Sequence, residues 1–342
     1  MNYKSGWLTL NRACNLRCKW CYAKGTGFKV KDDMDLELAY KLIDLFKELN
    51  IKSICLIGGE PTVYKHLTEV IKYANEKKIR LVMVTNGVCF ADEEYLDSII
   101  QSGIRNFNIS LKGYDKKSYK EVTGFDCYDK VMKAINNLSK RKVSFSISMV
   151  LTEDNIRDYT KGLKEAFAAG ARKASLSFCY DFSIDQKYKK DLSKLNPMKV
   201  INGFINSYDE LDKVTSHNFS LHQTYPLCLW DKNFIKKLEE KDQITSVCQL
   251  LTKSGLLFDT HGNIIPCNAM YEIKIGKYDK DFNDKDSLLK YMGNNNIKKL
   301  YNRLCGLPSK ECIKCNSVSN CGGGCVCQWT NYSFDELMKK VK

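Results

Sequence analysis

Two hydrophobic periodicities alternate along the first half of the chain. Six short segments are rich in β-branched, leucine and aromatic residues and are flanked by turn residues, as buried strands are. These predicted strands are residues 7–10, 53–57, 81–84, 106–111, 143–151 and 174–178. Between them, apolar residues recur every three or four positions, which places them on one face of a helix; 36–49, 96–100 and 131–138 are the clearest cases. The alternation predicts six βα units in a doubly wound sheet or a partial barrel.

The second half of the chain has weaker periodicity. Residues 186–247 are lysine-rich and look irregular, which predicts a bridging region. From Cys248 onward glycine and cysteine dominate, so we expect metal sites to replace a large apolar core there. The predicted organisation is an α/β domain over 1–185, a bridge over 186–247 and a small cysteine-rich domain over 248–342.

The composition of the 342 residues is that of a globular protein, with 44% hydrophobic and 27% charged residues. No segment approaches the roughly 18 uninterrupted apolar residues of a membrane helix, and the N-terminus lacks the apolar core of a signal peptide. We therefore expect a cytoplasmic protein with no membrane partner. The net charge of +14 raises the question of nucleic acid, but the lysines are scattered, as on a solvated surface, so that partner is not favoured.

Sixteen cysteines are too many for an ordinary cytosolic protein, where thiols stay reduced, and they indicate metal binding. Cys14, Cys18 and Cys21 form CNLRCKWC, a CxxxCxxC motif directly after the first predicted strand. Three thiolates on a short loop can bind three irons of a 4Fe–4S cluster and leave the fourth iron open. A zinc site completed by His66 or by a distant cysteine is the alternative.

This motif resembles the signature of radical S-adenosylmethionine (radical SAM) enzymes, and later segments extend the resemblance. Trp20 precedes the third cysteine, Gly58–Pro61 is similar to the family's GGEP motif, and TNG at 85–87 and SLKG at 110–113 fall at family landmarks. The resemblance implies contacts to S-adenosylmethionine (SAM) from six residues. They are Trp20, Gly58, Gly59, Glu60, Asn86 and Ser110.

Each of these motifs follows the C-terminal end of a predicted strand, where parallel α/β folds build their active sites. With the resemblance, this favours a partial (β/α)6 TIM-type barrel over a doubly wound sheet. Two residues depart from the family pattern: Lys112 stands where an aspartate is common, and Thr123 lies near the position of a frequent arginine. Tyr180 and Asp181 follow the sixth strand and are candidates for a catalytic base or a positioning group, with a solvent-exposed loop end as the alternative.

The C-terminal cysteines resemble a SPASM domain, an extension of radical SAM enzymes that holds two auxiliary iron–sulfur clusters. The pattern is Cx13Gx4C from Cys248 to Cys267, followed by Cx2Cx5Cx3C. The resemblance divides these cysteines between the two clusters, with Cys248, Cys267 and Cys325 binding the first and Cys312, Cys315 and Cys321 the second. A zinc ribbon is the rival interpretation.

Both auxiliary sets lack their usual fourth cysteine. For the first cluster, Cys228 is the nearest candidate, and an open coordination site is the alternative. For the second cluster, the usual final cysteine lies well downstream, so Cys327 is favoured over Cys305 or a ligand other than cysteine.

The resemblance implies an enzyme that takes one electron, from a reductant such as flavodoxin or ferredoxin, and cleaves SAM to a 5′-deoxyadenosyl radical that abstracts a substrate hydrogen. Relatives with this C-terminal domain often act on peptides, so a ribosomally made peptide is the favoured substrate, with a thioether or carbon–carbon crosslink or a side-chain oxidation as the outcome. The predicted barrel begins near residue 7, so a separate leader-recognition protein or direct peptide binding is expected.

Two other functions stay open. One is radical oxidation or epimerisation of a small molecule such as a sugar, an aminoglycoside or an amino acid. The other, from a different class, is a basic zinc-binding module for nucleic acid. A sulfatase-maturase activity is disfavoured, because Asn268 stands where that subgroup carries an aspartate.

Overall fold

The computed structural model of the protein describes residues 3–22, 32–179, 196–222, 225–245, 248–304 and 306–329. The strands are β1 (Ser5–Thr9), β2 (Ser53–Ile57), β3 (Arg80–Thr85), β4 (Asn106–Ser110), β5 (Ser144–Leu151), β6 (Ala174–Phe178), β7 (Phe219–His222), β8 (Ile244–Thr245), β9 (Gly255–Phe258), β10 (Asn263–Ile265) and β11 (Gly276–Lys277). The α-helices are α1 (Leu36–Glu48), α2 (Leu67–Glu76), α3 (Glu93–Gln101), α4 (Lys116–Thr123), α5 (Tyr128–Ser139), α6 (Tyr159–Ala168), α7 (Pro197–Val214), α8 (Lys232–Glu240), α9 (Gln249–Thr252), α10 (Lys285–Met292), α11 (Asn295–Leu304), α12 (Val318–Cys321) and α13 (Val326–Trp329).

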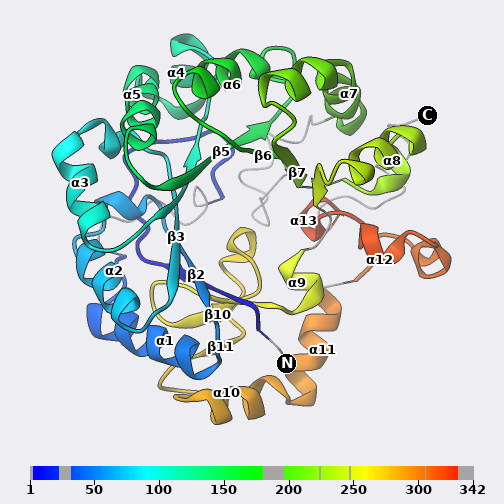
Figure 1. The fold of residues 1–342 in the computed structure, drawn as a ribbon. Coiled ribbons are helices and arrows are strands. Elements are labelled where there is room, and N and C mark those ends of the chain that lie inside the picture. The colour runs from blue at the N-terminus through cyan, green and yellow to red at the C-terminus, as the bar shows by residue number, and fades with distance from the viewer. Residues whose placement is uncertain are drawn as a thin grey trace.

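All six predicted strands are present, and β1 to β8 are neighbouring parallel strands in chain order. Helices α1 to α7 surround them on the outside (Figure 1). The strand order runs in one line from β11 to β8, so within the described residues the barrel is open. The prediction of a partial barrel is therefore confirmed.

The expectation of an irregular bridge is wrong for residues 197–245. This segment forms α7, β7, α8 and β8, which add two parallel strands to the barrel sheet. Helix α7 buries Val200, Ile201, Phe204, Tyr208 and Leu211 on one face. The apolar spacing is helical, but the many lysines around it conceal the pattern in the sequence.

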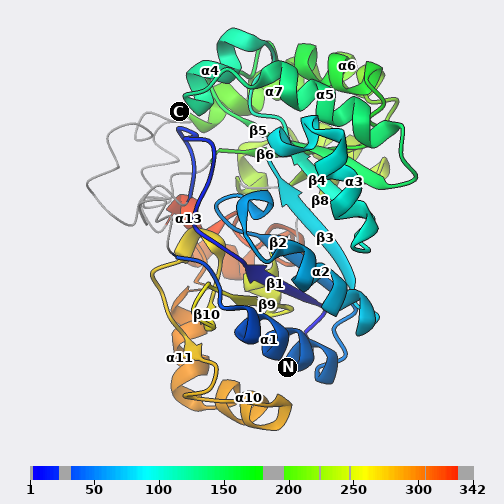
Figure 2. The same cartoon turned by 90° about the vertical axis from the view of Figure 1, so that its left-hand side faces the viewer.

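The cysteine-rich region continues the barrel sheet. Strand β9 pairs in parallel with β1, with Leu8 opposite Phe258, and β10 and β11 follow in antiparallel order. Helices α10 and α11 lie at the end of the molecule opposite α5 and α6 (Figure 2). The sheet does not end at residue 248, so the predicted domain boundaries stay a proposal.

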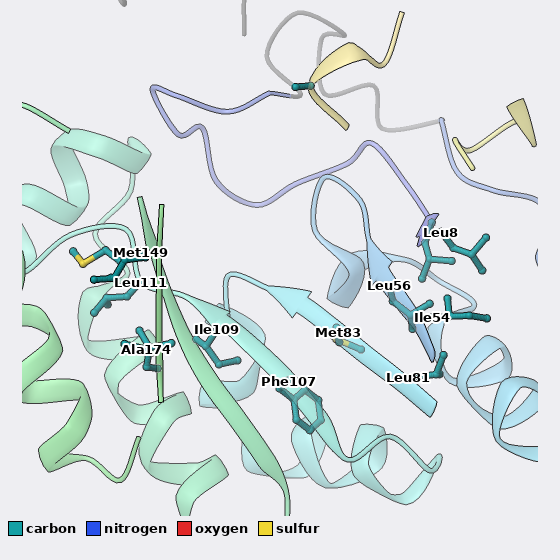
Figure 3. Packing of buried hydrophobic residues seen from close by; sticks show 14 of the residues in the cluster. Leu8, Ile54, Leu56, Leu81, Met83, Phe107, Ile109, Leu111, Met149 and Ala174 are labelled. Atoms are coloured by element: carbon teal, nitrogen blue, oxygen red, sulfur yellow. The ribbon is translucent and has the colours of Figure 1, made fainter. Parts of the chain in front are cut away.

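The two faces of the barrel sheet differ in chemistry. On β5, Ile147 and Met149 are buried in the apolar core, in which Met149 is labelled in Figure 3. Ser146 and Ser148 alternate with them along the strand and therefore face the barrel interior. The interior serines pair with β4: Asn108 Nδ2 donates to Ser146 Oγ at 3.0 Å, and the hydroxyls of Ser110 and Ser148 are 3.3 Å apart. The apolar core supports the barrel, and its polar interior is left for a ligand.

No helix among the described residues is long and apolar enough to cross a membrane.

Replacing Phe258 by alanine tests whether the C-terminal region and the barrel share one core. The Phe258 ring is fully buried, 5.6 Å from the ring of Phe46 on α1 and 6.3 Å from that of Phe282. We expect Phe258→Ala to lower the free energy of unfolding by about 3–5 kcal/mol. Urea unfolding of protein with equal metal loading measures this. Phe125→Ala is the control, since Phe125 is 44% exposed, and equal effects of the two changes would contradict a shared core.

Candidate active site and metal centres

One cavity opens at the C-terminal ends of the barrel strands, and it brings together residues from six separate segments, 14–22, 57–60, 84–86, 110–112, 150 and 177–179. Cys14, Cys18 and Cys21 line it. All six residues predicted to contact SAM line the same cavity: Trp20, Gly58, Gly59, Glu60, Asn86 and Ser110. The structure therefore gathers the predicted barrel-site residues in one place, while their roles stay predictions.

The cysteine loop packs directly on the glycine pair of the GGEP segment. Gly59 N–H donates to the carbonyl of Asn11 and Glu60 N–H to that of Ala13, both at 2.8 Å. A Cβ on Gly58 would overlap the Asn11 side chain, and one on Gly59 would overlap the Ala13 carbonyl. The glycines are required because two backbones meet here with no room for a side chain.

The end of α4 holds the other side of the loop. The N–H groups of Arg17 and Lys19 donate to the carbonyls of Thr123 and Val122, both at 2.9 Å. The Arg17 guanidinium also donates to the carbonyl of Cys14 at 2.6 Å. Thr123, which departs from the family pattern, therefore anchors the loop through its backbone.

Glu60 joins the ends of β2 and β3 through its buried carboxylate. It accepts hydrogen bonds from Thr62 N–H at 3.0 Å, Thr85 Oγ1 at 2.6 Å and Asn86 N–H at 2.7 Å. Burial raises the pKa of Glu60, and these hydrogen bonds oppose that shift. The Asn86 amide in turn donates to Asn15 Oδ1 in the cysteine loop at 2.6 Å, so the carboxylate network reaches the loop.

The loop thiols favour the protonated form without a metal. Burial raises the pKa of Cys14 to about 12 and that of Cys18 to about 11, although the Lys112 ammonium opposes the shift at Cys18. Metal binding reverses this preference, because a metal takes the thiolate form. The site is thus built to hold thiolate charge only with cations in place.

The donor set fits a 4Fe–4S cluster with SAM. Three thiols line the cavity, and buried hydrogen-bond donors lie near them. These donors have no hydrogen-bond partner in the described part of the chain. Trp20 Nε1 and the Tyr119 hydroxyl are buried donors of this kind, and Tyr119 lies near Cys14 and Cys18. Such donors suit sulfide, thiolate and nucleoside acceptors.

Among the described residues, no three His, Cys, Asp or Glu side chains are close enough together to surround a single metal ion. In a 4Fe–4S cluster each thiolate binds a different iron, so its ligands stand farther apart than those of one ion.

The C-terminal cysteines fall into two groups, which differ from the expected sets in one member each. Cys327 lies with Cys267, Cys325 and Cys248, and Cys228 lies with Cys312, Cys315 and Cys321. The expected assignment had Cys228 in the first set and Cys327 in the second. In the first group, the hydrogen bond from Cys327 lowers the pKa of Cys267.

Three of the residues singled out in the sequence lie outside the described residues: Cys305, Tyr180 and Asp181. The proposed catalytic roles of Tyr180 and Asp181 therefore stay predictions.

Several cavity residues had no assigned role in the sequence interpretation. Lys112 lines the cavity, as do Val150, Ser177 and Cys179. Each lies in or just after a predicted strand, which is the signal that identifies them. Successive side chains of a strand point to opposite faces of the sheet, so every second residue faces the barrel interior.

Comparison with known proteins assigns the barrel to a family. Residues 8–165 match the radical SAM superfamily. A probable GTP 3′,8-cyclase of Pyrococcus abyssi is 31% identical over 157 residues, which is 44% of this chain and 50% of that protein. The Fe-coproporphyrin III synthase of Methanosarcina barkeri is 28% identical over 149 residues, 44% of this chain and 37% of that protein. Residues 8–165 thus resemble a radical SAM domain, and the relatives that share this likeness are enzymes.

The chain spans about half the length, or less, of these curated relatives, but its fold likeness to solved structures is more extensive. Streptococcus suis SuiB bound to precursor peptide SuiA has a TM-score of 0.72 at 17% identity, covering 95% of this chain and 72% of SuiB. anSMEcpe with bound AdoMet and Kp18Cys peptide has a TM-score of 0.70 at 19% identity, covering 98% of this chain and 96% of that one. The likeness confirms the predicted fold class, a partial α/β barrel followed by a smaller cysteine-rich region.

Gly59→Ala tests whether the glycine contact positions the cysteine loop. The new Cβ would meet the carbonyls of Arg12 and Ala13, so the loop has to move. We expect the variant to lose about four irons per chain on anaerobic reconstitution, the content of one 4Fe–4S cluster. Gly293→Ala is the control, because Gly293 has an ordinary φ of −73° at the end of α10. Full iron content in Gly59→Ala, with circular dichroism unchanged, would refute the role of this contact.

Proposed function

We propose that this protein is a radical SAM enzyme that modifies a peptide. The observation that carries the proposal is the fold likeness over nearly the whole chain to two proteins that hold peptides, SuiB with its precursor peptide and anSMEcpe with Kp18Cys peptide. The relatives named for small-molecule chemistry match only 44% of this chain. The superfamily match also favours an enzyme over a nucleic-acid module.

In the proposed reaction, Cys14, Cys18 and Cys21 bind three irons of a 4Fe–4S cluster. When bound, the cluster and SAM supply a 5′-deoxyadenosyl radical: one electron from an external reductant breaks the carbon–sulfur bond, methionine leaves, and the radical takes a hydrogen atom from a substrate carbon. Glu60 holds the ends of β2 and β3 together, and the segment Gly58–Glu60, which lines the cavity, would receive the cofactor's ammonium group. The buried Trp20 indole N–H is available as a donor to the cofactor.

The remaining part of the cavity suits the substrate. Val150, Ser177, Phe178 and Cys179 line it from the ends of β5 and β6. These side chains are apolar or weakly polar, which excludes water from a radical site while leaving room for an aliphatic or aromatic side chain. A peptide that presents one residue to this surface fits that lining.

Two auxiliary clusters in the cysteine-rich region are part of the proposal. Crosslink formation or side-chain oxidation removes two hydrogen atoms from the substrate: one leaves with the radical, and the second leaves as a proton with one electron to spare. The cysteines of this region would hold a cluster that could accept that electron in its oxidised form, and a flavodoxin- or ferredoxin-type protein would carry it onward.

The function is tested by replacing all three loop cysteines with alanine. We expect Cys14→Ala/Cys18→Ala/Cys21→Ala to form no 5′-deoxyadenosine from SAM, yet to keep about eight of about twelve irons, because the other ligands lie in a different region. Liquid chromatography of the products and anaerobic iron analysis measure this, and Cys127→Ala is the matched control. 5′-Deoxyadenosine formation by the triple variant, or loss of all its iron, would overturn the assignment.

The substrate class is tested with short peptides encoded beside the gene. Incubation with SAM and a reductant should lower the mass of the correct peptide by two hydrogen atoms, for a crosslink or an oxidation, in step with 5′-deoxyadenosine. If no peptide changes while a sugar, aminoglycoside or amino acid stimulates 5′-deoxyadenosine formation, the small-molecule alternative is correct.

Lys112 is the one basic side chain among the described residues that line the cavity, and we assign it to the carboxylate of SAM. It lies near Cys18, beside the proposed cluster. Lys112→Met should weaken SAM binding about 10- to 100-fold, since it removes a hydrogen bond between charged groups. Equilibrium dialysis with labelled SAM measures this; Lys112→Arg should largely restore binding, and Lys130→Met, an exposed change on α5, should have no effect. Unchanged affinity in Lys112→Met would rule out the pairing.

A further inference from the structure

Eight thiols of the cysteine-rich region form two groups of four. Cysteines that are neighbours in the sequence do not always belong to the same group. We infer that Cys327 is the fourth ligand of one auxiliary cluster and Cys228 the fourth ligand of the other. The first group is then Cys248, Cys267, Cys325 and Cys327, and the second is Cys228, Cys312, Cys315 and Cys321. The inference rests on the proposed function and adds that neither auxiliary cluster has an open iron.

Contacts among the thiols define the first group. The Cys327 thiol lies next to the thiols of Cys267 and Cys325, close enough to interact with both. Cys248 lies close enough to Cys267 and Cys325 for their charges to interact. Cys327 is only 6% exposed and packs in the main apolar core together with the other three. It therefore cannot reach a site at the surface without leaving that core.

The second group forms around Cys228, in the 3₁₀-helix η5 (Leu227–Leu229). Cys228 lies close enough to Cys321, Cys312 and Cys315 for their charges to interact. Its neighbour Leu227 donates its N–H to the Cys321 sulfur at 3.3 Å, which fixes the two segments against each other. A region 94 residues away in sequence thus reaches the Cx2Cx5C loop.

Exposure separates Cys228 from an ordinary packing residue. The residues after it, Leu229 and Trp230, are buried, and the Trp230 ring lies 5.6 Å from that of Phe178 on β6. Cys228 itself is exposed. The apolar neighbours anchor the segment on the barrel and leave Cys228 exposed, near the other cysteines of the second group.

The backbone between the two groups explains why they divide at this point. Gly322, Gly323 and Gly324 all have positive φ, at 57°, 78° and 76°. Three consecutive residues of this kind redirect the chain sharply, which only glycine does without strain. Cys321 before the turn therefore joins the second group, and Cys325 after it joins the first.

The grouping has a functional consequence. A cluster with four protein thiolates has no iron free to bind a substrate, so both auxiliary clusters act by holding or passing electrons. Cys228 and Cys315 are exposed, and α12 lies at the edge of the molecule (Figure 1). The second cluster is thus the one that an external electron carrier reaches.

Paired backgrounds test the assignment in the full-length protein, reconstituted anaerobically. One background, Cys312→Ala/Cys315→Ala, removes the second cluster, and the other, Cys248→Ala/Cys267→Ala, removes the first. Cys228→Ala or Cys327→Ala is then added to each background and to the wild type. Iron and sulfide content and the electron paramagnetic resonance (EPR) signals of the reduced clusters are measured, with Cys127→Ala as the control.

We expect Cys228→Ala to change the EPR signals of the wild type and of the background that lacks the first cluster, but to add nothing where the second cluster is already gone. Cys327→Ala should give the mirror pattern, because effects within one ligand set are not additive. The reverse pattern, or effects of either change in both backgrounds, would overturn the assignment.

Two further results separate this inference from the proposed function. If the wild type holds only about four irons and still forms 5′-deoxyadenosine, the proposed auxiliary clusters are refuted and the proposed radical chemistry is not. If the EPR pattern is as expected but no 5′-deoxyadenosine forms, the ligand assignment is supported and the proposed activity is refuted. If an alanine variant does not fold, Cys228→Ser and Cys327→Ser replace it, and a shifted signal confined to one cluster is the expected result.

Discussion

The contact between the Gly58–Glu60 segment and the Asn11–Ala13 segment is the constraint on which the active site depends. Two backbone hydrogen bonds join these segments, and the absence of side chains on the glycines allows them to meet. The cysteine loop begins immediately after Ala13, and the buried carboxylate of Glu60 follows immediately after the glycines. A displacement at this contact therefore moves the cluster ligands and the cofactor-binding residues together, which makes their relative geometry a property of the barrel backbone.

The rest of the fold can be understood as support for that contact. The outer face of the sheet buries its apolar side chains against the helices, while the interior keeps serine and asparagine side chains that pair between β4 and β5. Charge inside the cavity is confined, among the described lining residues, to the thiols, Glu60 and Lys112. Radical chemistry needs such a site, because other hydrogen-atom donors near the radical compete with the intended substrate carbon.

Much of this could be predicted from the sequence, because the signals are local. The strand β5 alternates apolar and polar residues, and the CxxxCxxC and GGEP motifs each occupy one strand end. The errors arise where distant segments meet. The β9–β1 pairing and the placement of Cys228 beside Cys321 depend on tertiary contacts that spacing does not encode. Helix α7 was missed because lysines around it concealed its apolar face.

The central claim is that the barrel cavity holds a 4Fe–4S cluster whose fourth iron binds SAM. EPR spectroscopy of the dithionite-reduced protein, before and after SAM is added, tests this most directly. We expect SAM to change the signal of one cluster only, and this response to be absent when Cys14, Cys18 and Cys21 are replaced by alanine. Signals that do not change with SAM in fully loaded wild type would contradict the account.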